Sequence, residues 1–144
     1  MFEVKIAKSE ADIARAFEVR KKVFIEEQGV PPYLELDELD TTSTHFIIND
    51  GEKTVAAARL RESAPQVGKV ERVCVLKEYR GKHLGALMME NIEKFAREIP
   101  LQYLKLNAQS YAVQFYEKLG FDVTSPEFTE AGIPHRAMEK NLTK

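Results

Sequence analysis

Glycine and basic residues follow an apolar stretch of the chain, at the point where a helix is expected to begin. Residues 69–85 read KVERVCVLKEYRGKHLG, and residues 70–76 have the composition of a buried strand. The first turn of a helix has backbone N–H groups without partners and the positive end of the helix dipole, so it can bind a phosphate. We therefore expect Arg80 to Gly85 to hold a phosphorylated ligand, with Arg80 and Lys82 offsetting its charge. An ordinary glycine-containing helix start is the alternative that these six residues alone leave open.

The pattern around this turn predicts strands that alternate with helices. Asn49-Asp50-Gly51 favours a hairpin, because asparagine and glycine tolerate positive φ. Ser9 is a candidate cap for a helix that ends near Gln28, and Ser110 for one that ends at Gly120. A third helix is expected over residues 80–97, and a brief helical or irregular segment after Pro31 and Pro32. The seven expected strands are residues 2–7, 45–48, 54–60, 70–76, 103–108, 121–124 and 136–140. This order predicts an α/β protein in which helices cover both faces of a mixed sheet.

The composition is typical of one globular domain that spans residues 1–144, since 44% of the residues are hydrophobic and 31% are charged. A formal charge of −2 and a pI near 6.0 argue against nucleic acid as a partner. We find no apolar run of the roughly 18 residues that a membrane span needs, and therefore expect no membrane partner and a cytoplasmic location. The single cysteine, Cys74, cannot form an internal disulfide and is expected to be a buried, inert thiol. Three scattered histidines lack metal-site spacing, so no metal is expected.

Two motifs resemble those of a known enzyme family. Arg80-Gly81-Lys82-His83-Leu84-Gly85 is similar to the acyl-CoA signature Gln/Arg-x-x-Gly-x-Gly/Ala of the GCN5-related N-acetyltransferases (GNAT). His83 stands where the family has its central glycine, so its side chain is expected to turn outward, into solvent or toward a phosphate. Asn107 and the segment SYAVQFYEKLGF, residues 110–121, resemble the later acyl-CoA motif of the same family.

This resemblance implies a fold, a substrate and a set of binding residues. The GNAT fold is a seven-stranded mixed sheet whose fourth and fifth strands splay apart, and the pantetheine arm of the coenzyme fills the gap. Acetyl-CoA would be the acyl donor, and a small-molecule primary amine would attack it directly in a ternary complex, without a covalent enzyme intermediate. The residues that the resemblance assigns to coenzyme binding are Val73, Cys74, Val75, Arg80, Gly81, Lys82, His83, Leu84, Gly85, Ala86, Asn107 and Tyr116. A homodimer is plausible by analogy with the fold.

Two residues are candidates for acid–base chemistry. Tyr116 matches the helical tyrosine of the family and could protonate the departing thiolate; the alternative is a core aromatic residue. Glu71 shares strand parity with Val73 and Val75, so it could face the same cleft and accept the proton of the amine. A strand carboxylate paired with Arg59 or Arg72 is the competing interpretation of Glu71.

An acidic segment is expected to form one wall of the acceptor site. Between Glu26 and Asp40 the chain has six carboxylates and no Lys or Arg. In the resembled fold this region lines the acceptor side of the cleft, where it would attract a cationic amine. The predicted acceptor-binding residues are Glu26, Glu27, Asp37 and Arg59, while a solvated acidic loop is the alternative.

Two other functions compete with an N-acetyltransferase. Arg20, Phe24, Glu35, Asp37 and Asp40 occur at spacings similar to those of acyl-homoserine-lactone synthases, which share the transferase fold. The second alternative is a module that binds acyl-CoA without catalysis, because the central glycine of the signature is replaced.

Overall fold

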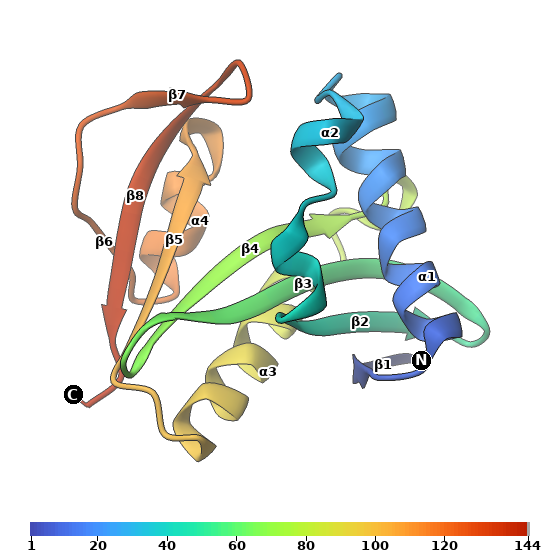
Figure 1. Ribbon diagram of the computed structural model, residues 1–144, viewed down its shortest axis with the longest axis horizontal. Coiled ribbons are helices and arrows are strands. Elements are labelled where there is room, and N and C mark those ends of the chain that lie inside the picture. Colours follow the sequence, from blue (N-terminus) through green and yellow to red (C-terminus); the bar gives the residue numbers. More distant parts are fainter. Residues whose placement is uncertain (144) are drawn as a thin grey trace.

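One open sheet organises residues 1–143, the part of the chain that this computed structural model describes (Figure 1). The strand order is β1-β2-β3-β4-β5-β8-β6, and β7 pairs with β8. The strands are β1 (Phe2–Ala7), β2 (Thr44–Asp50), β3 (Lys53–Ala64), β4 (Val67–Val75), β5 (Tyr103–Gln109), β6 (Asp122–Val123), β7 (Phe128–Glu130) and β8 (Ile133–Asn141). Neighbouring strands are antiparallel except β4 and β5, which are parallel.

The fourth and fifth strands diverge, which confirms the predicted splay. Their ladder joins Val67–Lys69 of β4 to Tyr103–Lys105 of β5 and goes no further along β4. Figure 1 shows the two strands meeting at one end and separating toward the other. The remaining edge of β4 therefore presents backbone groups to the gap rather than to a neighbouring strand.

Helices cover both faces of the sheet, as the alternation of strands and helices predicted. The helices are α1 (Glu10–Arg20), α2 (Pro32–Glu35), α3 (Leu84–Glu98) and α4 (Val113–Lys118). Phe17 of α1 packs against His45, whereas Phe95 of α3 packs against the next residue of β2, Phe46. Because successive side chains of a strand point to opposite faces, α1 and α3 lie on opposite sides of the sheet. None of the helices within residues 1–143 has the length and apolar character that crossing a membrane requires.

Local sequence signals set several helix ends. The Ser9 hydroxyl accepts a hydrogen bond from the Asp12 N–H at 3.1 Å and so caps α1. The helix continues as π-helical turns over Lys21–Glu27, and Gly29 then has a φ of +74°. Gly120, with a φ of +95°, follows the end of α4 as predicted. The acidic segment is briefly helical in α2 and in a 3₁₀ turn, Glu38–Thr41.

Two elements differ from the sequence expectation. The helix expected from residue 80 begins at Leu84, because Gly81 and His83 have left-handed φ values of +80° and +63° that a helix cannot contain. The sheet also has an eighth strand, β7, which pairs with the start of β8. Pro134 opposes Thr129 in this ladder, where a residue without an N–H is tolerated because the pair lies at an edge.

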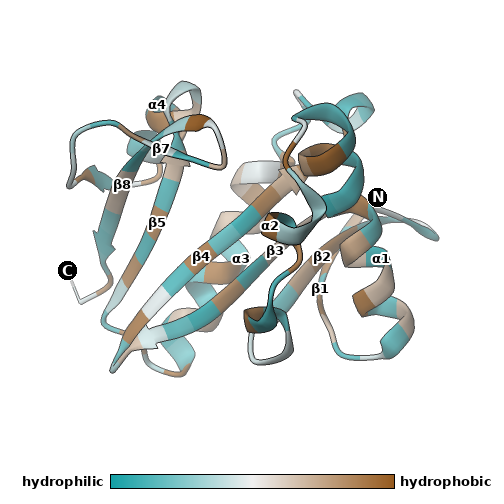
Figure 2. Cartoon of the chain, turned by 45° about the horizontal axis from the view of Figure 1, so that its top comes forward, coloured by the Kyte–Doolittle hydropathy of each residue, from teal (hydrophilic) through white to brown (hydrophobic). Residues whose placement is uncertain are grey.

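Alternation along β5 shows how a strand serves both the core and the cleft. Leu104, Leu106 and Ala108 are buried, while Asn107 and Gln109 between and beyond them are only partly buried. Figure 2 shows the corresponding bands of apolar and polar colour along this strand. One face of β5 thus packs in the core, and the other presents amide side chains.

Candidate active site

A cavity of about 740 Å³ lies where β4 and β5 separate. Its walls come from the end of the first helix, α2, β4, β5, α4 and the turn between β7 and β8. Many of the predicted site residues meet in this cleft, namely Asp37, Arg59, Glu71, Val73, Cys74, Val75, Arg80, Asn107 and Tyr116. Glu26, Glu27 and the turn from Gly81 to Ala86 are outside the lining. Gln28 and Gln109 join the two walls through a side-chain hydrogen bond of 2.9 Å.

The free edge of β4 can accept an extended polar ligand. The Leu76 N–H donates to the carbonyl of Val55 at 2.9 Å, which directs it toward β3. Because N–H groups alternate in direction along a strand, those of Val75 and Val73 point the other way, into the gap. Two amides at this spacing can bind the carbonyl oxygens of an amide-containing chain as an added strand would.

A β-bulge at Arg72 changes which face Glu71 occupies. Glu71 pairs with Arg59, but Cys74 pairs with Ala57, so β4 contains one extra residue, and Arg72 has a φ of +60°. Glu71 therefore lies on the face of Arg59, whereas Val75, the partner of Ala56, lies on the opposite face. The expectation that Glu71 shares a face with Val73 and Val75 is wrong, because the bulge reverses the strand parity.

The turn before α3 has the features of an anion site. The first-turn amides of Leu84, Gly85 and Ala86 have no partners within the helix, and no side chain among the described residues caps it. A Cβ on Gly85 would lie 3.1 Å from the ring of Phe115, so the helix approaches this ring closely only because residue 85 is glycine. Lys82 and His83 are exposed beside these amides. Amides and positive charge together fit a phosphate or pyrophosphate.

Arg80 links the phosphate turn to the first helix. Its guanidinium donates to both carboxylate oxygens of Glu27, at 2.6 and 2.7 Å, and its Nε donates to the Val75 carbonyl at 3.1 Å. Glu27, which was expected to face the acceptor, is thus engaged by a residue of the phosphate turn.

Tyr116 is a buried aromatic residue whose ring lines the cleft. Its side chain packs edge-to-face against Phe115 and Phe121, with ring centroids 4.9 and 5.9 Å away. Burial raises the pKa of its phenol above the ordinary value, so the hydroxyl stays protonated at neutral pH. The tyrosine therefore fits both alternatives, since it packs in the core and can donate a proton.

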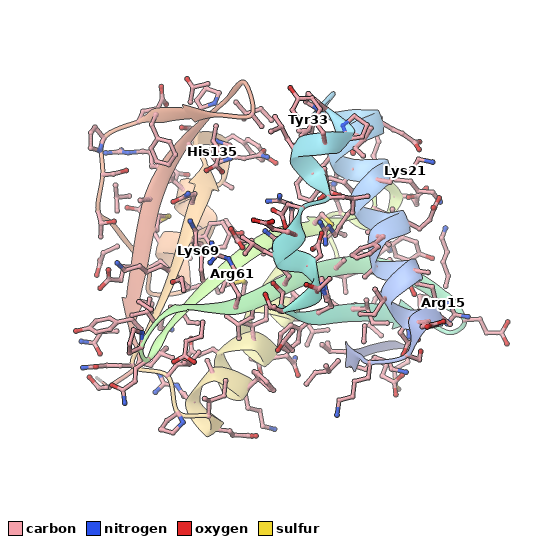
Figure 3. The ribbon with its side chains drawn as sticks, in the orientation of Figure 1. Arg15, Lys21, Tyr33, Arg61, Lys69 and His135 are labelled. Carbon is pink, nitrogen blue, oxygen red and sulfur yellow. The ribbon has the colours of Figure 1, made fainter. Side chains whose placement is uncertain are left out.

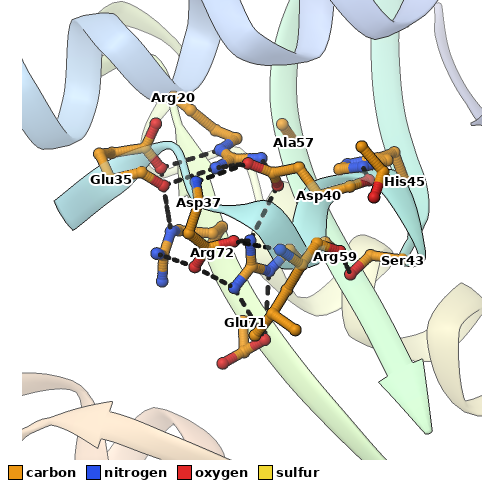
Figure 4. A network of polar contacts seen from close by, with 12 residues as sticks. Arg20, Glu35, Asp37, Asp40, Ser43, His45, Ala57, Arg59, Glu71 and Arg72 are labelled. Atoms are coloured by element: carbon orange, nitrogen blue, oxygen red, sulfur yellow. Dashed lines mark hydrogen bonds and ion pairs between the residues drawn. The ribbon is translucent and has the colours of Figure 1, made fainter. Parts of the chain in front are cut away.

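Four arginines and four carboxylates form a network, here called the arginine cluster, that binds the acidic segment to the sheet (Figure 4). Its members are Arg20, Arg59, Arg61, Arg72, Glu35, Asp37, Asp40 and Glu71. Arg20 donates to Glu35 at 2.9 Å and to Asp40 at 2.7 Å. Arg59 donates to Asp37 at 2.7 Å and to Asp40 at 2.8 Å. Sequence inspection did not identify Arg20 and Arg72 as partners of the acidic segment.

The arginine cluster neutralises the acidic segment where it meets the cleft. Four positive and four negative side chains cancel, and the arginines bind Glu35, Asp37 and Asp40. Burial would raise the pKa of Asp40, but hydrogen bonds from Arg20 and Arg59 outweigh it and lower the pKa from 3.8 to about 2. These pairings neutralise Glu35, Asp37 and Asp40, which supply half of the six carboxylates on which the expected preference for a cationic acceptor rests.

Glu71 belongs to the same cluster. Burial would raise the pKa of Glu71, but its hydrogen bond from Arg61 and the nearby charge of Arg59 lower it. Glu71 is therefore a paired strand carboxylate, as the competing interpretation stated. Its partners are Arg59 and Arg61 rather than Arg59 or Arg72. A carboxylate with a lowered pKa is a weak base at neutral pH.

Comparisons with known proteins agree with the mixed, splayed sheet and show the family. The family described as Acetyltransferase (GNAT) domain matches residues 8–142. The chain is 46% identical over 137 residues to the uncharacterized N-acetyltransferase YjcF of Bacillus subtilis, covering 94% of this chain and 97% of the relative. A provisionally assigned N-acetyltransferase from Lactobacillus plantarum superposes with a TM-score of 0.92 at 29% identity, covering 98% of each chain. ElaA of Escherichia coli superposes with a TM-score of 0.87 at 27% identity, covering 98% of this chain and 100% of that one. This chain belongs to the GNAT family of acetyltransferases.

Proposed function

We propose that this protein transfers the acetyl group of acetyl-CoA to the primary amine of a small acceptor. The observation that carries the proposal is the free edge of β4 beside the uncapped first turn of α3. Together they offer amides to a pantetheine arm and to a pyrophosphate at neighbouring places in the fold. Membership in the GNAT family supports acyl transfer as the reaction class.

The amine attacks the thioester directly in this proposal. Cys74 is the only thiol of the chain, and burial raises its pKa to about 12. A thiol with that pKa has almost no thiolate at neutral pH and cannot serve as an acyl carrier. The lone pair of the neutral amine forms the new C–N bond, the C–S bond breaks, and the amine loses one proton while the sulfur gains one.

Tyr116 supplies the proton to the sulfur. Its phenol is protonated at neutral pH and lines the cleft, and a protonated phenol can donate to a departing thiolate. The Val73 N–H, which points into the gap, polarises the thioester carbonyl. Glu71 accepts the amine proton less readily than an unpaired carboxylate would, because Arg59 and Arg61 lower its pKa.

Substitution of Tyr116 by phenylalanine tests this assignment. We expect Tyr116→Phe to lower kcat by about 10²- to 10⁴-fold, the usual contribution of a general acid, with little change in CoA affinity. Thiol release from acetyl-CoA and mass detection of products from an amine panel measure the rate, and calorimetry measures the affinity. Tyr111→Phe is the matched control, since Tyr111 also lines the cleft but is 80% exposed.

Three outcomes would contradict the proposal in different ways. An unchanged kcat in Tyr116→Phe would leave Tyr116 as a packing residue only. Tight CoA binding without product from any amine would favour the non-catalytic acyl-CoA-binding module. Absence of CoA binding would overturn the use of the cleft altogether.

A further inference from the structure

Lys69 is a cation of the cleft that forms no ion pair within residues 1–143. Glu71, on the same face, feels its charge but is bound by Arg59 and Arg61. Four cationic side chains line the cleft, and three of them have carboxylate partners: Arg59 with Asp37, Arg72 with Glu35, and Arg80 with Glu27. Lys69 is partly buried and makes no hydrogen bond or ion pair to any of residues 1–143. Its ammonium is available to a ligand in the cleft.

Strand register places Lys69 in the middle of a row of cations. It pairs with Arg61 across β3 and β4, and with Lys105 across β4 and β5. Directly opposed like charges destabilise a sheet unless other charges compensate for them. Glu71 is 2.8 Å from Arg61, and Glu139 is 3.7 Å from Lys105, but the central lysine has no such partner. A bound anion would supply the missing charge.

The row lies on the acceptor side of the sheet. Lys69, Arg61, Arg59 and Glu71 share one face, because Lys69 pairs with Arg61 and Glu71 with Arg59. Figure 3 shows Lys69 and Arg61 next to the opening between β4 and β5, with His135 farther along the opposite wall. On that wall Glu130 accepts a hydrogen bond from Asn107 at 3.2 Å and lies 3.8 Å from His135, and no ion pair joins it to Lys69.

We propose that the acceptor is an amine that also carries a carboxylate, and that Lys69, beside Arg61, binds this carboxylate. This inference rests on the proposed function and names the class of its acceptor. It assigns the anion-binding part of the cleft to Lys69, which no motif of the sequence pointed out.

Strand geometry limits the distance between the amine and the carboxylate. Lys69 precedes Val73 by four residues, but one of them is the extra residue of the bulge at Arg72, so the strand advances by about three residues, or about 10 Å. A lysine side chain that leans along the strand spans roughly 6 Å of that distance. The acceptor should therefore have its amine at least about 4 Å from its carboxylate, as in an ω-amino acid or a dipeptide.

A series of ω-amino acids serves as the test. Glycine, 4-aminobutyrate, 5-aminopentanoate and 6-aminohexanoate are each compared with the n-alkylamine of the same length, with acetyl-CoA as donor. We expect the three amino acids longer than glycine to exceed their alkylamines in kcat/KM by about tenfold or more, the usual effect of a charge-assisted hydrogen bond, mainly through KM. Glycine, which is too short to span the distance, should show no such advantage.

Substitutions then test whether Lys69 is responsible for the preference for amino acids over alkylamines. Lys69→Met should abolish the advantage of the amino acids over the alkylamines, and Lys69→Arg should retain it. Lys105→Met is the matched control, because Lys105 lies in the same row but is 51% exposed and outside the cleft lining. Circular dichroism checks that each variant is folded. Alkylamines that match the amino acids in the wild type, or discrimination that survives Lys69→Met, would overturn the inference while leaving the proposed function intact.

Absence of acetylation of every amine would contradict the proposed function. A binding measurement tests the carboxylate site even in that case. Calorimetry with CoA present compares 6-acetamidohexanoate with the uncharged 6-acetamidohexanamide. About tenfold tighter binding of the carboxylate in the wild type, lost in Lys69→Met, supports the carboxylate site. Equal or undetectable binding of the two compounds refutes it.

Discussion

Replacement of Arg59 by methionine tests whether the arginine cluster holds the acceptor wall on the sheet. The Arg59 side chain is 1% exposed and contacts three carboxylates: Asp37 at 2.7 Å, Asp40 at 2.8 Å and Glu71 at 3.1 Å. Without it, each carboxylate keeps one arginine, with Asp40 still bonded to Arg20. The substitution thus leaves a buried excess of negative charge instead of a balanced network.

The expected loss of stability follows from burial and from the pKa of Asp40. Breaking a buried ion pair by removing one partner costs about 3–5 kcal/mol. The lowering of the Asp40 pKa from 3.8 to about 2 corresponds to about 2 kcal/mol, and Arg59 is one of two arginines responsible for it. Arg59 thus accounts for a share of the Asp40 contribution, and the loss of its contacts to Asp37 and Glu71 adds to that share. We therefore expect Arg59→Met to lower the free energy of unfolding by about 3 kcal/mol.

The pKa of Asp40 also fixes the direction in which the free energy of unfolding changes with pH. Because folding lowers the pKa of Asp40, its contribution is fully present above pH 3.8 and is lost as the pH falls toward 2. In Arg59→Met this pKa moves back toward its ordinary value, so the free energy of unfolding should change less steeply between pH 4 and pH 2.

Urea unfolding followed by circular dichroism at pH 7, 4 and 3 measures both effects. Arg61→Met is the matched control: Arg61 contacts Glu71 alone among the carboxylates and is 22% exposed, so its loss should cost about 1 kcal/mol or less. Equal destabilisation by the two substitutions, or an unchanged slope with pH in Arg59→Met, would refute the reasoning.

Two further predictions concern the phosphate turn. His83→Gly should raise the free energy of unfolding by about 0.5–1 kcal/mol, because relief of the left-handed φ of +63° exceeds the added backbone entropy of glycine. Thermal denaturation measures this, and Lys82→Gly, at a residue without positive φ, should lower stability instead; a loss in both variants would contradict the strain argument. Glu27→Gln should tighten CoA binding by about 2- to 5-fold by releasing Arg80 from a partly exposed ion pair, whereas Arg80→Gln should weaken it. Calorimetry at low and high salt measures both affinities, and unchanged binding in both would exclude Arg80 from the coenzyme site.

Local signals explain why so much of the fold was predictable. The hairpin at Asn49-Asp50-Gly51 forms because Gly51 adopts a φ of +60°, and Asp50 pairs with Lys53 across it. Ser9 caps α1 through a residue three positions away. Such interactions depend on neighbours in sequence, so composition and spacing reveal them.

The candidate site was predictable only in part. The motif residues Val73, Arg80, Asn107 and Tyr116 do line one cleft. Lys69 was missed, because a lysine at the start of a strand has no distinctive sequence pattern. Its significance depends on tertiary structure: Arg61 and Lys105 lie opposite it on the neighbouring strands, and no carboxylate forms an ion pair with it among residues 1–143.

The amino-acid sequence by itself determined where strands and helices form and which turn offers free amides to an anion, because those features arise from residues within a few positions of one another. Tertiary structure alone decided how the charges are paired: Glu35 binds Arg20 and Arg72, which are 15 and 37 positions away, and one extra residue at Arg72 decides which face Glu71 occupies. Pairing between distant strands sets those contacts, and a single-residue shift in register reverses the face of every side chain beyond it.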